Sequence, residues 1–457
     1  MVSLPPSAAL PSVTVVVLSY NSRQHLETCF RSLLALRYPA EQLELMLVDN
    51  ASTDGSLEFA ASRFPQITTV ANPENYGFAR GNNEGARRAR GQWVAFLNPD
   101  MRVASDWLVE LAAPMQRDPD IVCVASKILS WDGRRIDFAG SGMNVLGYGY
   151  QEGWGDPATT HDQEKLILAP CGGAMLTDRQ VFLDSGGFDE DYFAFYEDLD
   201  WGWRLWVMGH KVVYAPRAIA YHIHHGSWKR VSNEKIVLLY QRNAFSTLFK
   251  NYGDEQLSRV LPAALLLYLR RAYLATRVDS SRVRSEPRAI APHLYTEVPH
   301  INTPRRRALG SAGQQTYNIA YYLREAWRTL RDDGPGELWR KAAIEARNRW
   351  QNRPRLPRSP SRRVNRRAGP GRTSVDKRTV SHLIAADDLA QDLPRLMQKR
   401  QVVQSRRRRS DQEIFALFRW PLGADYPNSY YIQTLQDLAE ACGIQNFFGQ
   451  EQEPTQR

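Results

Sequence analysis

Short apolar runs alternate with amphipathic segments through the first half of the chain. Residues 13–19 (VTVVVLS), 43–48 and 94–97 are aliphatic or β-branched runs bounded by turn residues, and each predicts a buried strand. Residues 22–36 lie between the first two runs and carry apolar side chains at helical spacing. Strands without alternation belong to sheets covered on both faces, and strand–helix–strand order gives parallel crossover connections. The pattern therefore predicts an α/β fold built on a mostly parallel sheet.

Polar residues follow each of these predicted strands. Asn21 comes after the first run, Asp49 after the second, and Asn98 and Asp100 after the third, with Pro99 ending the strand ladder between them. Asn, Pro and Asp also make ordinary surface turns, so no single cluster is decisive. Carboxyl ends of parallel strands meet at one sheet edge, which is where open α/β sheets bind ligands. The convergence of three clusters there predicts a ligand site.

Residues 186–201 combine six carboxylates with six aromatic side chains. Glu197, Asp198 and Asp200 open a segment with helical spacing. Acidic residues in a first helical turn interact favourably with the helix dipole, which is a purely structural explanation. However, a carboxylate walled by aromatic rings is partly desolvated and can accept a proton near neutral pH. These carboxylates are therefore candidates for acid–base chemistry.

Histidines cluster after the next predicted strand. Residues 216–227 (PRAIAYHIHHGS) carry His222, His224 and His225. In an extended segment the side chains of His222 and His224 share one face, whereas that of His225 does not. Imidazole is a common metal ligand, so the segment is a candidate metal site, and single histidines are more often structural. The irregular, aromatic-rich residues 131–162 predict an ordered but mobile loop.

Charge and cysteine content narrow the class of protein. The formal net charge of +10 indicates an anionic partner, such as nucleotide phosphates, nucleic acid or an acidic membrane surface. The four cysteines are far apart without a CxxC pair, which favours a reducing compartment. The first residues have no basic n-region and no run of 18 apolar residues occurs, so neither a signal peptide nor a spanning helix is expected.

The second half of the chain is more basic. Residues 257–274 are apolar with interspersed arginines and predict either a membrane-interface helix, with arginines at the headgroups, or part of a core-facing helix pair. Residues 353–378 and the arginine run 406–409 have the composition of a solvated, flexible tail.

Several motifs occur together in the N-terminal half. They are VVVLSYN (15–21), VDNASTDGS (48–56), ENYGFARGNN (74–83), FLNPD (96–100), GGAML (172–176), GGFDEDYFAFYEDLDWGWR (186–204) and the His222 segment. In this order and spacing, residues 13–250 resemble the inverting nucleotide-sugar glycosyltransferases of family 2, especially the rhamnosyltransferase-like branch. The resemblance implies a glycosyltransferase A-type fold, with a Rossmann-like, mostly parallel sheet, helices on both faces and a mainly helical C-terminal extension.

The resemblance also implies roles for individual residues. Asp198 matches the catalytic base, and Asp100 and His222 match the ligands of a divalent cation (Mn²⁺ or Mg²⁺), with His224 as the alternative to His222. Asn98 stands where an aspartate is common, so the donor's diphosphate must supply most of the negative charge around the ion. Donor-binding positions fall on Ser19, Asn21, Asp49, Asn82, Asn98, Asp100 and Gly173, and supporting or acceptor-binding positions on Glu197, Asp200 and Trp201.

These implications lead to a predicted domain organisation and function. We expect a nucleotide-sugar-dependent domain at residues 12–252, a helical, membrane-associating region at 253–352, a basic flexible linker at 353–412 and a small C-terminal element at 413–457. The expected reaction moves a sugar from a dTDP-rhamnose or UDP-hexose type donor to a hydroxyl of a cell-envelope or lipid-linked glycan. The expected location is cytoplasmic, peripheral on the anionic inner face of the cell membrane.

Two other classes of protein fit parts of the sequence. A catalytically degenerate glycosyltransferase-fold scaffold is disfavoured because Asp100, Asp198 and His222 are all present. A nucleic-acid-binding protein that acts through its basic tail is disfavoured because the arginines lie in Pro- and Gly-rich sequence without an aromatic platform.

Overall fold

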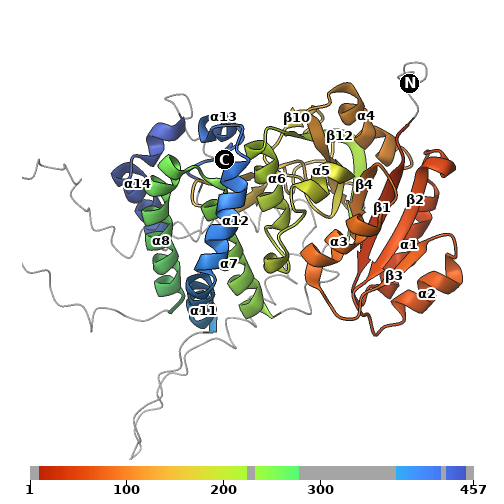
Figure 1. Cartoon of the computed structure of the whole chain (residues 1–457), viewed down its shortest axis with the longest axis horizontal. Helices are drawn as coiled ribbons and strands as arrows, with labels where there is room; N and C mark the ends of the chain where they lie inside the picture. The colour runs from red at the N-terminus through yellow and green to blue at the C-terminus, as the bar shows by residue number, and fades with distance from the viewer. Residues whose placement is uncertain (1–9, 224–231, 277–376, 424–428, 449–457) are drawn as a thin grey trace, which may run out of the picture. The chain divides into compact units, whose positions relative to one another are not determined.

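A ten-stranded mixed sheet forms the centre of the N-terminal half (Figure 1). The computed structural model describes residues 10–223, 232–276, 377–423 and 429–448. The strand order is β10-β12-β6-β11-β4-β1-β2-β3, with β5 beside β12 and β7 beside β6. The strands are β1 (Val13–Ser19), β2 (Leu43–Asp49), β3 (Thr68–Ala71), β4 (Trp93–Leu97), β5 (Met101–Val103), β6 (Ile121–Ser130), β7 (Ile136–Phe138), β10 (Lys165–Leu166), β11 (Ala174–Asp178) and β12 (Lys211–His222).

The pairing confirms the predicted α/β fold class, but the sheet is mixed and not mostly parallel. Strand β1 runs parallel to β2 and β4, β2 runs parallel to β3, and β12 runs parallel to β6. Strand β11 is antiparallel to both β4 and β6 and joins the two parallel halves. Every residue of β4 is buried, as its uninterrupted apolar run predicts for a strand covered on both faces. The architecture is a Rossmann-like α/β sheet with helices packed on it.

Helices of the first half pack on the sheet as its crossover connections. Helix α3 approaches β1 so closely that a Cβ added at Gly81 would lie 2.6 Å from Leu18, and one at Gly85 would lie 2.5 Å from Val16. Only glycine permits this approach, which brings the start of α3 to the carboxyl edge of the sheet. The helices are α1 (Arg23–Leu34), η1 (Ala40–Gln42), α2 (Ser56–Arg63), α3 (Gly77–Arg88), α4 (Trp107–Arg117), α5 (Arg179–Asp184), η2 (Glu190–Tyr192) and α6 (Glu197–Val207).

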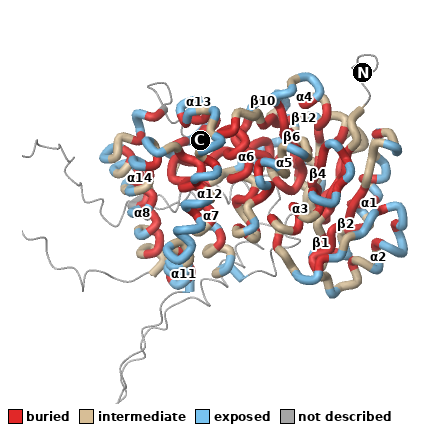
Figure 2. The backbone as a smooth tube through the Cα atoms, viewed as in Figure 1, coloured by how far each residue is buried: buried red, intermediate tan, exposed pale blue. Residues whose placement is uncertain are grey.

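The segment at residues 131–162 is more regular than its composition indicated. It contains β7 and the two-stranded sheet of β8 (Ser141–Met143) and β9 (Gly149–Gln151). Residues 136–148 are all buried, so the prediction of a mobile loop was wrong for this part. They share this burial with the central strands β1 and β4, which Figure 2 shows in red.

Helices from the C-terminal half belong to the same compact unit as the sheet. Helix α12 contacts α6 and α7, and α11 contacts α7 and α8, as the blue and green helices of Figure 1 show. Buried side chains such as Leu396, Val403 and Phe418 contribute to one hydrophobic core with the sheet domain. These helices are α7 (Asn233–Asn251), α8 (Asp254–Thr276), α11 (Lys377–Gln391), α12 (Leu393–Ser405), α13 (Asp411–Phe415), α14 (Ser429–Ala441) and η6 (Ile444–Phe448).

Two predictions about basic segments were wrong. The expected flexible linker at 353–412 contains α11 and α12 in its described part. The arginine run is engaged rather than solvated, since the Arg407 guanidinium donates to the carbonyl of Asn251 and the Arg409 guanidinium donates to that of His210. These arginines satisfy carbonyl oxygens of neighbouring elements, a role that depends on tertiary contacts.

Helix α8 matches the core-facing alternative along one side. Arg271, expected among lipid headgroups, is 8% exposed and stacks on the rings of Tyr148 and Tyr431, at 3.7 and 5.0 Å from the ring centroids. Leucines on another side of α8 stay exposed. Within the described part of the chain, no helix combines the length and apolar character needed to cross a bilayer.

Candidate active site

The carboxyl ends of β1 and β2 place two buried polar side chains next to each other. Ser19 and Asp49 are register partners in the parallel pair, and their residues are 0% and 2% exposed. One oxygen of Asp49, Oδ2, accepts the Ser52 amide at 2.8 Å. The other, Oδ1, and the Ser19 hydroxyl have no hydrogen-bond partner among the described residues. Buried polar atoms without partners are rare, so this pair is suited to a ligand that donates hydrogen bonds.

Two of the predicted donor-site asparagines have local structural contacts. The side-chain oxygen of Asn21 accepts the Thr53 amide at 2.8 Å and joins the loops that follow β1 and β2. Asn21 has a φ of 51°, a left-handed conformation that asparagine tolerates better than most residues. Asn82 donates to the carbonyl of Phe78 at 3.0 Å, within α3. Both side chains shape this edge, and their contact with a donor stays a prediction.

The dipeptide Gly172–Gly173 joins the Asn-Pro-Asp triplet to the candidate base. The Gly173 carbonyl accepts the Asn98 amide at 2.8 Å, and the Gly172 amide donates to Asp198 Oδ2 at 2.9 Å. A Cβ at Gly173 would lie 2.6 Å from Asn98 Nδ2, so a larger residue would displace that side chain. The tertiary structure therefore brings Asn98 and Asp198 together although they are 100 positions apart in the sequence.

Asp100 and His222 also meet, with a third residue behind them. His222 Nε2 lies 3.6 Å from Asp100 Oδ2, and its Nδ1 lies 2.6 Å from Asp137 Oδ2. Burial alone would lower the pKa of His222, but the two carboxylates raise it to about 9. The Asp137 carboxylate on Nδ1 fixes the orientation of the ring, which is the usual arrangement around ligating histidines.

The residues at this position fit a divalent cation as a pair of protein ligands. Asp100 Oδ2 and His222 Nε2 converge on one point, and no group of three or more metal-ligating side chains occurs among the residues that the structure describes. His224 lies outside the described residues. Sequence reasoning missed Asp137, and the only local signal was an acidic residue between two apolar ones in a short run.

Asp198 and Glu197 lie at the first turn of α6. Asp198 accepts the Gly172 amide through Oδ2 and the Leu199 amide, at 2.8 Å, through Oδ1. Glu197 is 6% exposed, and its Oε2 has no hydrogen-bond partner among the described residues. Burial raises the pKa of both carboxyl groups, and the charge of Asp198 raises that of Glu197 further. A partly desolvated carboxylate of this kind can act as a proton acceptor near neutral pH.

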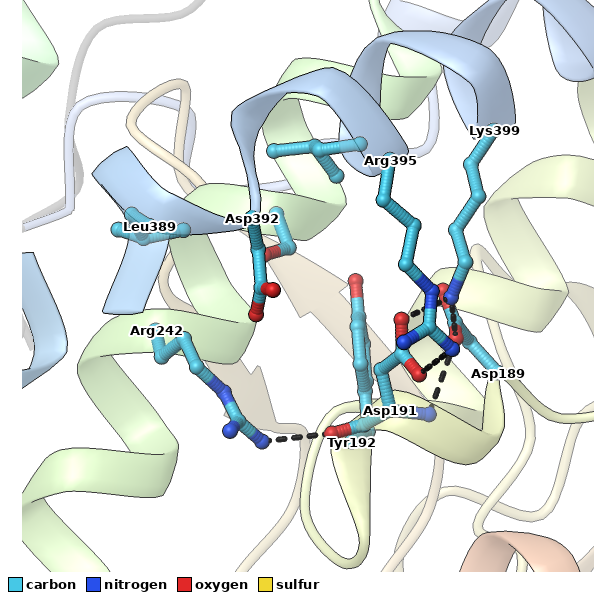
Figure 3. A pocket seen from close by; sticks show the side chains of 10 residues that line it. Asp189, Asp191, Tyr192, Arg242, Leu389, Asp392, Arg395 and Lys399 are labelled. Atoms are coloured by element: carbon cyan, nitrogen blue, oxygen red, sulfur yellow. Dashed lines mark hydrogen bonds and ion pairs between the residues drawn. The ribbon is translucent and has the colours of Figure 1, made fainter. Parts of the chain in front are cut away.

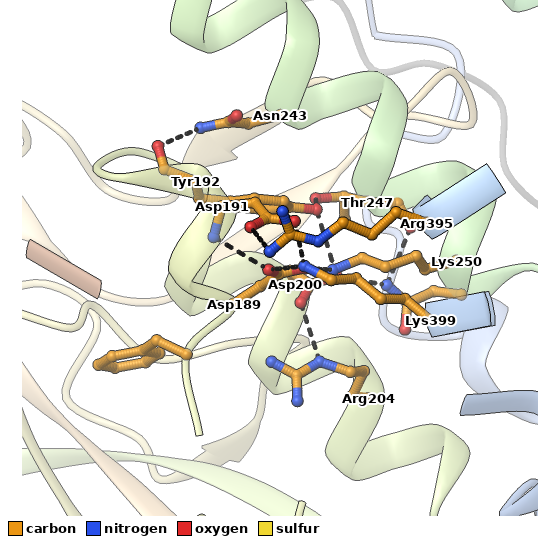
Figure 4. Close-up of polar contacts among 12 residues, drawn as sticks. Asp189, Asp191, Tyr192, Asp200, Arg204, Asn243, Thr247, Lys250, Arg395 and Lys399 are labelled. Carbon is orange, nitrogen blue, oxygen red and sulfur yellow. Dashed lines mark hydrogen bonds and ion pairs between the residues drawn. The ribbon is translucent and has the colours of Figure 1, made fainter. Parts of the chain in front are cut away.

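Asp200 and Trp201 do not face this site. Asp200 is 0% exposed and binds Arg204 Nε at 2.8 Å, Lys250 Nζ at 3.0 Å and Asn251 Nδ2 at 3.0 Å (Figure 4). Trp201 is also 0% exposed and its indole N–H donates to a buried serine hydroxyl. Of the two predicted roles, support of the base or contact with the acceptor, burial favours support for both residues, because they point into the core while Asp198 faces Gly172.

The turn that precedes Glu197 is strained. Phe193, Phe195 and Tyr196 have φ values of 60°, 68° and 69°, which bulky residues adopt at a cost of about 1–3 kcal/mol each. The fully buried Asn243 on α7 offsets part of this cost, since its side-chain N–H groups face three carbonyls of the turn at 2.8–3.1 Å. Backbone strain of this kind is concentrated at functional sites.

The strained turn presents an aromatic surface beside the carboxylates. The rings of Phe195 and Tyr240 lie 4.6 Å apart between centroids, and Tyr240 is 41% exposed. Burial of its hydroxyl end raises the pKa of Tyr240, and the nearby Asp198 and Glu197 raise it further. Sequence reasoning missed Tyr240 because it lies on a helix that showed no motif.

The chain is similar to known glycosyltransferases. Residues 14–184 match the family described as Glycosyl transferase family 2. An N-acetylglucosaminyl-diphospho-decaprenol L-rhamnosyltransferase of Mycobacterium tuberculosis is 29% identical over 240 residues, which cover 46% of this chain and 75% of that protein. The O-antigen biosynthesis protein RfbC of Myxococcus xanthus is 29% identical over 236 residues, which cover 49% of this chain and 18% of that protein.

The matches are partial in length. The chain spans 38% of another curated relative, from Drosophila melanogaster. A crystal structure of GalNAc-T7 with UDP, GalNAc and Mn²⁺ aligns with a TM-score of 0.47 at 19% identity, over 61% of this chain and 54% of that chain. The family match begins at β1 and includes Asp49, Asn98 and Asp100. The matched residues 14–184 are therefore similar to family 2 glycosyltransferases, and they contain β1, β2, β4 and the polar residues at the carboxyl ends of these strands.

Proposed function

We propose that this chain is an inverting glycosyltransferase that moves a sugar from a nucleoside diphosphate donor to an acceptor hydroxyl. The observation that carries the proposal is the Gly172–Gly173 junction. It holds the Asp198 carboxylate, through the Gly172 amide, next to Asn98, which precedes the Asp100–His222 pair. Such an arrangement places a proton acceptor and a diphosphate-binding edge on either side of one reacting carbon.

The donor would bind along the carboxyl edge. Asp49 Oδ1 would accept a hydrogen bond from the nucleotide base, and the Ser19 hydroxyl would donate or accept one, since neither atom has a partner among the described residues. Asp100 and His222 would hold a divalent cation, Mn²⁺ or Mg²⁺, which when bound neutralises the charge of the departing nucleoside diphosphate. The likeness to a mycobacterial rhamnosyltransferase supports a dTDP-rhamnose or UDP-hexose type donor.

The chemistry assigned to Asp198 is general-base catalysis. Its carboxylate accepts the proton of the acceptor hydroxyl as that oxygen forms a bond to the anomeric carbon. The bond from the anomeric carbon to the diphosphate oxygen breaks on the opposite face, and its electron pair leaves with the nucleoside diphosphate. A single displacement inverts the configuration and requires no covalent enzyme intermediate. Burial raises the pKa of Asp198, which favours proton uptake by this carboxylate.

The acceptor side would use the aromatic surface of Phe195 and Tyr240. One face of a sugar ring carries mainly C–H groups, which pack on aromatic rings, while hydroxyls at the ring edge reach carboxylates. The exposed ring of Tyr240 next to Asp198 meets both requirements. We therefore propose an acceptor that ends in a sugar, as a cell-envelope or lipid-linked glycan does.

A lipid-linked acceptor agrees with peripheral attachment to the inner face of the cell membrane. Leu265, Leu266 and Leu269 lie on one side of α8 and are 46%, 52% and 59% exposed. An apolar stripe of this kind, on a chain with a net charge of +10, is suited to an anionic bilayer surface. Flotation with anionic liposomes should bring the protein to the top of the gradient, and protein that stays in solution would contradict this attachment.

Calorimetric titration of a nucleotide-sugar panel tests the proposed activity. We expect one donor to bind in the presence of Mn²⁺ or Mg²⁺, with much weaker binding after EDTA. Asp49→Ala should weaken that binding, whereas Asp118→Asn, which removes a partly exposed ion pair with Lys211, should not. A folded protein that binds no donor would contradict the proposal.

A further inference from the structure

Helix α12 binds the acidic turn at residues 189–192, which precedes the strained turn and Asp198. Arg395 and Lys399 are four residues apart on α12, so their side chains extend from the same face. The Arg395 guanidinium binds the Asp191 carboxylate, and the Lys399 ammonium binds both Asp189 and Asp191 (Figure 3). These contacts join segments that are more than 200 positions apart in the sequence.

Buried ion pairs connect this acidic turn to α6. Lys250 Nζ lies 2.5 Å from Asp189 Oδ2 and 3.0 Å from Asp200 Oδ1, with 2% of the lysine side chain exposed (Figure 4). Burial alone would raise the pKa of Asp189, but Lys250 and Lys399 hold it well below its usual range. Asp189 therefore stays ionised, and Asp200, which also binds Lys250, lies on α6 only two residues after Asp198.

Other side chains of α12 bind the junction of α7 and α8. Arg400 donates to the carbonyls of Phe249 and Tyr252 at 2.6 and 2.5 Å, and Gln404 donates to that of Lys250 at 2.8 Å. The Arg400 residue is 6% exposed. Helix α12 is thus attached both to the helix that carries Asn243 and Lys250 and to the acidic residues that precede the strained turn.

The strained turn depends in part on contacts from other elements. Phe193, Phe195 and Tyr196 have positive φ values, so the turn needs external contacts to persist. Asn243 supplies contacts from α7, and the start of α3 supplies another, since the Phe78 amide donates to the Phe193 carbonyl at 2.6 Å. The acidic residues before the turn are attached to α12.

We propose that α12 is a brace that positions the catalytic base, with Lys399 and Arg395 as its positioning residues. This inference rests on the proposed function, because it assigns to the C-terminal extension the placement of Asp198 and of the aromatic surface. It predicts that a chain without the ion pairs of Lys399 and Arg395 still binds the donor but loses turnover. The donor-binding residues lie on β1, β2 and the Asn-Pro-Asp turn, which α12 does not contact through either side chain.

The test compares variants of the full chain. Lys399→Met and Arg395→Met remove the contacts, Lys399→Arg restores a cation, and Asp191→Asn removes one carboxylate from the other side. Arg406→Met is the matched control, since Arg406 lies just after α12 and donates to the carbonyl of Asp184 instead of the turn.

We expect Lys399→Met to lower kcat about tenfold with the donor KM unchanged, because small displacements of a reacting group are costly. Lys399→Arg should recover part of the rate and Arg406→Met should keep it. The double variant with Lys399→Met and Asp191→Asn should raise the activation free energy by less than the sum of the increases in the two single variants, because both remove the same ion pair. A wild-type kcat for Lys399→Met, or a loss of the same size in Arg406→Met, would overturn the proposal.

Hydrogen exchange tests, in the absence of substrate, whether α12 stabilises the strained turn. Amides of residues 193–199 should exchange faster in Lys399→Met than in the unaltered chain, whereas amides of β1 and β2 should not. Unchanged exchange in this turn would overturn the brace even if the enzyme is active. Absence of turnover in the unaltered chain, with faster exchange in the variant, would instead contradict the proposed function and retain the brace.

Discussion

Replacing Asp198 with asparagine separates its chemical role from its structural one. The carboxylate accepts two backbone amides, one through each oxygen, at 2.9 and 2.8 Å. An asparagine side chain has one acceptor oxygen, so its amide nitrogen must face the N–H of either Gly172 or Leu199. The loss of one such bond with a buried donor left unpaired costs about 1–3 kcal/mol of folding stability. Relief of the charge repulsion with Glu197 acts in the opposite direction.

The effect on rate should be larger than the effect on folding. General-base catalysis contributes roughly 10²–10⁴-fold, which corresponds to about 2.7–5.4 kcal/mol of barrier height. The variant should therefore lose at least about 100-fold in kcat, while donor affinity measured by calorimetry stays near that of the unaltered chain. Asp118→Asn, a substitution of the same type on the surface, should change neither quantity.

The pH profile gives an independent check. Burial raises the pKa of Asp198, so kcat/KM for the acceptor should fall as the pH drops through that raised value. Because Glu197 and Asp198 interact, the midpoint belongs to the pair of carboxyl groups. The assay is release of nucleoside diphosphate under saturating donor between pH 5 and pH 9. Turnover of Asp198→Asn within threefold of the unaltered chain would refute the assignment of the base.

Three further substitutions test other parts of the site. Asp137→Asn should weaken Mn²⁺ binding about 10–100-fold in calorimetry with a nucleoside diphosphate, because it frees the His222 ring, and unchanged affinity would exclude this role. Glu197→Gln should raise the melting temperature, and the gain should grow from pH 5 to pH 8. The raised pKa of Glu197 means that the folded state pays an increasing cost as pH rises above the unfolded pKa and towards the folded one. A gain that does not depend on pH would contradict this reasoning. Lys250→Met should cost up to about 3–5 kcal/mol in urea unfolding, since it removes the buried cation that Asp189 and Asp200 share and leaves them only Lys399 and Arg204. A loss below about 1 kcal/mol would show that these buried ion pairs have little effect on stability.

The sequence alone determined the sheet and its functional edge. Uninterrupted apolar runs predict buried strands because hydrophobic periodicity is a local property, and β1, β2 and β4 form at those runs. The polar residues that follow them had to converge, since parallel strands end on the same side of a sheet. Asp49, Asn98 and Asp100 were identified in this way.

The tertiary structure decided which way each side chain faces and which distant charge it meets. Asp198 and Asp200 are two positions apart in one acidic motif, yet one faces Gly172 and the other is buried against Lys250. Asp137, Tyr240 and Lys399 lie in segments whose composition indicated a loop, an ordinary helix and a flexible tail. Their roles depend on pairings across about 40 to 210 positions, which periodicity, composition and spacing do not encode because each of these describes only neighbours along the chain.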